Sequence, residues 1–135
     1  MIVATSDYKQ SVDIGSYSIW HALYSTVISQ PNQVKCNFPD AISFLQNGSC
    51  SADRAERTAR QLNLVRDCLS LVSPDKAVYD IDNSQVDAPW KNSISSIVTS
   101  CANLFTTADG MDLLCELVRL LSYASNANVS VEIVG

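Results

Sequence analysis

Short stretches of alternating apolar and polar residues at the two ends of the chain predict β-strands. Residues 2–6 and 10–14 are two such stretches with a polar turn between them, and this arrangement predicts an opening hairpin. Near the other end, Val129, Val131 and Ile133 occupy every second position, which places their side chains on one face. The sequence therefore predicts a final, half-buried strand.

Between these strands, apolar residues recur at helical spacing. The pattern predicts a helix over residues 16–29, a short helix from about Pro39 to Gly48, and a long helix over residues 51–72. The long helix has one apolar stripe and a charged opposite face. A fourth helix is expected to end near Ser125, and its apolar residues cover a wide arc, which predicts extensive burial.

The stretch between the third and fourth helices has a weaker pattern. Residues 77–81 are rich in β-branched and aromatic residues, which predicts a short inner strand. Residues 82–96 are polar and predict an irregular loop, with a turn of helix near residues 92–97. Residues 101–107 fit either a strand or the end of a helix.

Strands at both ends with helices between them predict an α+β fold. We expect a single small domain over residues 1–135, in which the N- and C-terminal strands form a small, largely antiparallel sheet with helices packed against it. The length of 135 residues suits one domain and one hydrophobic core. The chain has no internal repeat and no linker that would separate two domains.

Composition and charge narrow the classes of partner. Hydrophobic residues make up 47% of the chain and charged residues 17%, a balance typical of a folded protein. The net charge of −5, without a clear basic patch, argues against direct binding to nucleic acid. A negative surface favours fast association with a positively charged protein, because complementary fields steer the encounter.

Targeting and cysteine patterns indicate a cytoplasmic protein with reduced thiols. The first ten residues do not resemble a signal peptide, and the longest apolar run, residues 1–4, is too short to span a membrane. Five cysteines are an odd number, and their spacing suits neither a disulfide framework nor a metal pair. Cys68 and Cys115 are expected to be small core residues. The cysteines are Cys36, Cys50, Cys68, Cys101 and Cys115.

The single histidine, His21, is the first candidate for chemistry. It lies in the first predicted helix near Ser25, and a histidine can act as general base for a serine nucleophile. However, no nucleophile-elbow motif accompanies the pair. A structural histidine that makes one hydrogen bond at the flank of an apolar stripe is the favoured interpretation, so we expect no catalytic residues.

Carboxylates concentrate between Asp75 and Asp87. Paired acids can support acid–base chemistry or bind a divalent metal, but this stretch lacks the glycine and the final glutamate of a calcium-binding loop. We therefore expect no metal and no cofactor. A solvated loop and an acidic docking surface for a basic partner both remain open.

Two further features have both a structural and a functional interpretation. Trp90 follows Pro89 in a polar stretch, where it either fills a gap in the core or anchors an interface. Four arginines of the long helix could bind phosphate, but acids precede two of them by four residues, which favours a solvated face with Asp53–Arg57 and Glu56–Arg60 ion pairs. The arginines are Arg54, Arg57, Arg60 and Arg66.

An ordered series of short motifs spans nearly the whole chain. In order, the motifs are Ile14-Gly15-Ser16-Tyr17-Ser18, Phe38-Pro39, Val78-Tyr79-Asp80-Ile81, Pro89-Trp90, the stretch from Thr107 to Leu113, and the stretch from Val129 to Ile133. This order resembles the immunity protein 70 family of bacterial polymorphic toxin systems. Apart from Phe38-Pro39, the residues between Lys35 and Asp53 do not strengthen the resemblance.

The resemblance implies a cytosolic antidote that binds one cognate toxin domain, as in contact-dependent growth inhibition. Such toxins are often nucleases with basic surfaces, and an acidic inhibitor could cover them. On this basis we expect Asp80, Asp82 and Asp87 to contribute to the toxin-binding surface, with Trp90 supporting or anchoring it. The alternatives are a small-ligand-binding or adaptor domain without a toxin partner and, less favoured, a small hydrolase. A homodimer is a further possibility, since the last helix carries so wide an apolar arc.

Overall fold

The computed structural model describes residues 1–31 and 37–135, and within them the chain forms one small α+β unit. Four α-helices and a three-stranded sheet are present in this part of the chain, so the predicted fold class is confirmed. The elements are β1 (Ile2–Thr5), β2 (Ser11–Asp13), α1 (Tyr17–Ile28), α3 (Pro39–Asn47), α4 (Ala52–Leu69), the 3₁₀ helix η1 (Pro74–Lys76), α5 (Leu113–Ala127) and β3 (Val131–Ile133).

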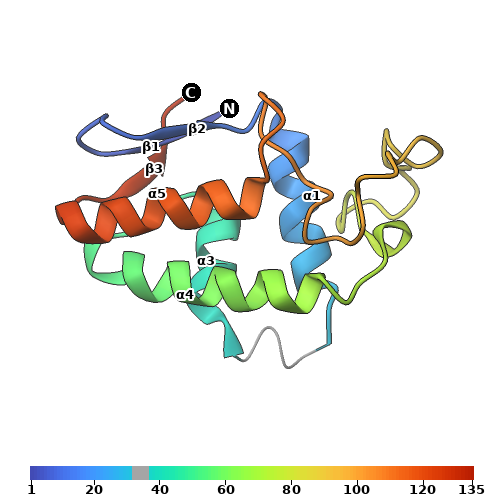
Figure 1. Cartoon of the computed structure of the whole chain (residues 1–135), viewed down its shortest axis with the longest axis horizontal. Helices are drawn as coiled ribbons and strands as arrows, with labels where there is room; N and C mark the ends of the chain where they lie inside the picture. The colour runs from blue at the N-terminus through green and yellow to red at the C-terminus, as the bar shows by residue number, and fades with distance from the viewer. Residues whose placement is uncertain (32–36) are drawn as a thin grey trace.

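The two ends of the chain form one antiparallel sheet, as the sequence predicts. The strand order is β2-β1-β3, and Val3 of the central strand pairs with Val12 on one side and Ile133 on the other. The Ile2 N–H donates to the carbonyl of Gly135 at 3.0 Å, so the termini lie side by side (Figure 1). The sheet packs against α5, because Val3 and Val12 point into the core.

Helices α4 and α5 run antiparallel and build the centre of the core (Figure 1). The predicted apolar stripe of α4 is confirmed up to Leu69, since Ala55, Ala59, Leu62, Val65 and Leu69 are all buried. The leucines of α5 are also buried within the chain, so the wide apolar arc no longer favours a homodimer. These leucines are Leu113, Leu114, Leu117, Leu120 and Leu121.

Helix α1 packs against α3. Its Trp20 is buried edge-on against Phe44, and the indole N–H donates to the carbonyl of Leu45 at 2.7 Å. The helix ends at Ile28, one residue before the predicted end. Cys36, expected to be a reduced thiol, lies outside the described residues.

The predicted strand at residues 77–81 is wrong. Residues 77–112 contain neither a helix nor a regular strand, apart from an isolated bridge between Thr106 and Asp112. The backbone N–H and carbonyl of Val78 are both bonded to the side chain of Thr26, so no neighbouring strand can pair there. Residues 92–97 contain turns and no helix, so the predicted turn of helix is wrong. Residues 101–107 contain turns and the bridge at Thr106, and they form neither a regular strand nor the end of a helix.

The cysteines in the described part of the chain are all free thiols. Burial raises the pKa of Cys101 to about 11 and also raises the pKa of Cys50, which keeps both thiols protonated and poorly nucleophilic. Cys68 is half-buried, whereas Cys115 is exposed, so the prediction of a core role for Cys115 is wrong. Within residues 1–31 and 37–135, no helix has the length and apolar character needed to cross a membrane.

Candidate functional site

A long loop of residues 77–112 lies beside α1 at one end of the molecule (Figure 1). Irregular segments of this length are uncommon in compact domains, and those that are ordered frequently carry function. Residues 81–87 are all exposed, and they include the predicted acids Asp82 and Asp87. The loop is therefore the first place to look for a binding surface.

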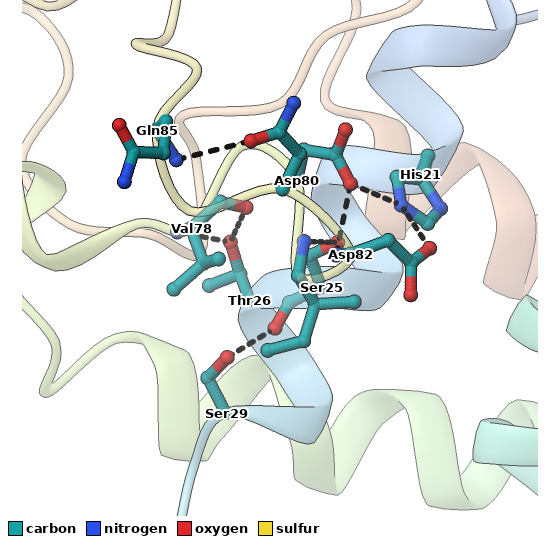
Figure 2. A network of polar contacts seen from close by, with 10 residues as sticks. His21, Ser25, Thr26, Ser29, Val78, Asp80, Asp82 and Gln85 are labelled. Carbon is teal, nitrogen blue, oxygen red and sulfur yellow. Dashed lines mark hydrogen bonds and ion pairs between the residues drawn. The ribbon is translucent and has the colours of Figure 1, made fainter.

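Two buried hydroxyls of α1 hold the start of this loop. The Thr26 hydroxyl accepts from the Val78 N–H at 3.0 Å and donates to the Val78 carbonyl at 3.1 Å. The Ser25 hydroxyl accepts from the Ile81 N–H at 3.0 Å (Figure 2). Both hydroxyls are fully buried. These bonds fix the backbone on either side of Asp80, so its side chain starts from a fixed point beside α1.

His21 meets two carboxylates of the loop (Figure 2). Its Nε2 atom lies 3.0 Å from Asp80 Oδ1 and 3.2 Å from Asp82 Oδ2. The Asp82 N–H also donates to Asp80 Oδ1 at 3.0 Å, which closes a tight turn between the two acids. The His21 ring stacks on Tyr17, with ring centroids 6.1 Å apart. The histidine thus joins α1 to the loop.

The hydrolase alternative loses its nucleophile. Ser25 is fully buried, and its hydroxyl is engaged by the Ile81 N–H, so a substrate cannot reach it. The imidazole Nε2 of His21 faces Asp80 and Asp82. The favoured sequence interpretation, a structural histidine, agrees with this geometry, although His21 contacts two carboxylates where one partner was expected.

The structure brings three of the four predicted toxin-binding residues to one cavity. Asp80, Asp87 and Trp90 line a cavity of about 490 Å³, together with Tyr79. Asp82 is not among its lining residues and lies toward His21, with its side chain 81% exposed. The four residues therefore lie in the same part of the loop, three of them at the cavity and Asp82 beside His21.

Trp90 and Asp87 differ in how they are held. Trp90 is half-buried and packs edge-on against Tyr79 at 5.6 Å and against Phe105 at 6.0 Å, measured between ring centroids. Trp90 therefore supports the loop from within, because it packs between two other parts of it. Asp87 Oδ1 lies 3.1 Å from Lys91 Nζ, and both side chains are largely exposed. Such a pair is weak, so the carboxylate remains available to a partner.

Sequence reasoning missed the apolar residues of this surface. Ile81 is 41% exposed, Val86 is 44% exposed and Ile97 is 80% exposed. The available signal was the presence of large apolar residues in a polar stretch without periodicity. Apolar side chains among charged ones are typical of surfaces that bind proteins.

Two of the four arginines of α4 contact acids on neighbouring elements. Arg57 does not form the predicted pair with Asp53, because its Nε donates to Asp40 at the start of α3. The hydrogen bond from Arg57 lowers the pKa of Asp40. Arg66 lies 3.7 Å from Asp112 at the start of α5. Arg57 and Arg66 therefore help to hold α4 against α3 and the start of α5. The predicted alternative of a phosphate-binding site on α4 gains no support.

Comparison with known proteins adds one finding. The family model described as immunity protein 70 matches residues 3–133, a range that includes most of β1 and all of α1, the loop of residues 77–112 and β3. Neither the curated proteins nor the solved structures give a match.

Proposed function

The chain belongs to the immunity protein 70 family, and from this membership we propose that it protects bacteria by binding and neutralising a cognate toxin domain. The observation that carries the proposal is the family match over residues 3–133, which includes the entire described binding neighbourhood. The proposed action is binding without catalysis, inside the cytoplasm, as part of a polymorphic toxin system such as contact-dependent growth inhibition.

We propose that the toxin docks on the loop of residues 77–112. Asp82 and Asp87 are the exposed acids of this surface, and Asp80 borders the cavity. Trp90 supports the loop by packing between Tyr79 and Phe105. The exposed side chain of Val86 adds apolar contact beside the acids. This combination suits a partner with a basic, partly apolar surface.

A nuclease toxin is the proposed partner. Nucleases hold a phosphate backbone with lysine and arginine, and an acidic inhibitor can bind the same side chains. The net charge of −5 supports this idea, since long-range attraction accelerates the encounter of oppositely charged proteins. Inhibition would then result from occupying the surface that the nucleic acid needs.

The test is co-expression with the toxin domain encoded immediately upstream. We expect the chain to restore growth of cells that produce this toxin and to co-purify with it as a complex. A toxin from an unrelated system serves as the control and should be neither bound nor neutralised. If the cognate toxin kills the cells and does not co-purify, the immunity function is wrong.

The cavity of about 490 Å³ supports a second candidate function, the binding of a small ligand. Its volume is in the range of small-molecule sites. Genes of a metabolic operon beside this one would favour that function, whereas a large secreted protein with a C-terminal toxin domain favours immunity. Thermal unfolding in the presence of metabolite mixtures would detect such a ligand through a rise in Tm.

A further inference from the structure

Two carboxylates converge on one imidazole nitrogen where α1 meets the loop of residues 77–112. His21 Nε2 lies 3.0 Å from Asp80 Oδ1 and 3.2 Å from Asp82 Oδ2 (Figure 2). One ligand atom from each of the three residues lies within 4.8 Å of those of the other two. The group therefore differs from a simple patch of surface acids, since it combines nitrogen and oxygen donors that point at one place.

The group has more negative charge than its members can balance. The Nε2 atom carries either one hydrogen or one lone pair, so it can donate to only one of the two carboxylates. The three side chains together carry a charge of −1 with a protonated histidine and −2 with a neutral one. Among the described residues, no lysine or arginine forms an ion pair with Asp80 or Asp82. A bound cation would balance both acids at once.

We propose that His21 Nε2, Asp80 Oδ1 and Asp82 Oδ2 bind a divalent transition-metal cation. Ligand atoms about 2.1 Å from such a cation are about 3 Å apart when they occupy adjacent octahedral positions. The separations of 3.0 and 3.2 Å already match this spacing. An imidazole donor favours zinc, nickel, iron or copper over magnesium, calcium and manganese, which prefer oxygen donors.

The surroundings hold the donors in place and leave a route for the ion. The bonds from Ser25 and Thr26 fix the backbone around Asp80, and the ring of Tyr17 stacks on His21. The Asp82 side chain is 81% exposed, so water can fill the remaining coordination positions. A bound cation would clamp the loop of residues 77–112 to α1. This site needs no toxin and stands independently of the proposed function.

The test is a titration of the full, metal-stripped chain with Co²⁺, whose absorption spectrum reports its ligands. We expect one Co²⁺ per chain, with the weak visible bands of nitrogen and oxygen ligation, and a rise in Tm on binding. His21→Gln and Asp82→Asn should each abolish binding. Asp67→Asn removes one exposed carboxylate from α4 and should retain it. Excess Mg²⁺ should not displace the Co²⁺.

Three outcomes would overturn the metal site. The first is the absence of Co²⁺ binding by the unsubstituted chain. The second is a spectrum with intense thiolate absorption, which would assign the ion to cysteines. The third is binding that survives both His21→Gln and Asp82→Asn. Because the Asp82 side chain is mostly exposed, Asp82→Asn tests the site without endangering the fold, and circular dichroism verifies that the His21→Gln chain is folded.

Discussion

His21 of α1 and Asp80 of the loop are 59 positions apart in sequence, yet His21 Nε2 and Asp80 Oδ1 lie 3.0 Å apart. This contact joins the N-terminal half of the molecule to the acidic surface proposed to bind the toxin. It also makes Asp80, with a side chain only 29% exposed, the most constrained of the three predicted acids. Asp82 and Asp87 are therefore the better residues for testing the surface.

Reversing the charge of the exposed acids should weaken toxin binding. We expect Asp82→Lys combined with Asp87→Lys to lower the association rate at low salt by about tenfold or more and to reduce its dependence on salt. Surface plasmon resonance over a series of salt concentrations measures both effects. The control combines Asp67→Lys with Glu132→Lys, which changes the net charge equally at exposed positions outside the loop. Equal effects of the two pairs would place the docking surface elsewhere.

Removing the Thr26 hydroxyl should loosen the loop. Thr26→Val leaves the N–H and carbonyl of Val78 without their partner in a partly buried place, which costs about 1–3 kcal/mol. Urea unfolding measures the loss, and hydrogen exchange at Val78 should accelerate. Thr26→Ser keeps the hydroxyl and should lose less. If Thr26→Val is as stable as the unsubstituted chain, this hydrogen-bonded anchor contributes nothing to the fold.

Alanine should be tolerated less well at Gly48 than at Gly110. Both glycines have positive φ, +71° and +84°, where a side chain costs about 1–2 kcal/mol. A Cβ at Gly48 would also clash with Ile133 Cδ1, whereas nothing lies within 4 Å of a Cβ at Gly110. Ile133 is 40% exposed and can rotate away, so we expect an added loss of about 0.5–1.5 kcal/mol.

Gly110→Ala is the matched control in this pair, because it reports the backbone strain alone. Urea unfolding of the two variants gives the difference directly. Equal losses would show that Ile133 does not pack over Gly48.

Acid should weaken the link between α3 and α4. The hydrogen bond from Arg57 lowers the pKa of Asp40 below 3.8, so this contact stabilises the fold above the unfolded-state pKa. The stabilisation is lost as the pH falls from about 4 through the lower pKa of the folded state. Asp40→Asn should therefore lower stability at pH 7 and reduce the change in stability between pH 4 and pH 2.

Unfolding by urea across this pH range measures the effect of Asp40→Asn. Asp67→Asn removes an equal charge from an exposed position of α4 and serves as the control. If the free energy of unfolding falls as steeply between pH 4 and pH 2 in Asp40→Asn as in the unsubstituted chain, the role of Asp40 is contradicted.

Local patterns were sufficient for the regular elements. Alternation predicted the hairpin and the last strand, and helical spacing predicted α1, α3, α4 and α5, because each of these elements buries one face of its own. The same reasoning failed at residues 77–81. A β-branched and aromatic stretch predicts a strand only when a neighbouring strand is available, and here the hydroxyl of Thr26 takes both backbone groups of Val78.

The sequence by itself determined an acidic α+β domain with terminal strands in one sheet, and its ordered motifs indicated the immunity protein family. Only the tertiary structure placed Asp80 and Asp82 against His21, separated Asp82 from the cavity beside Trp90, and moved Arg57 to Asp40. The physical reason is the separation in sequence of the residues that interact. Periodicity follows from the geometry of neighbouring residues, whereas these contacts depend on how α1, α4 and the long loop pack together.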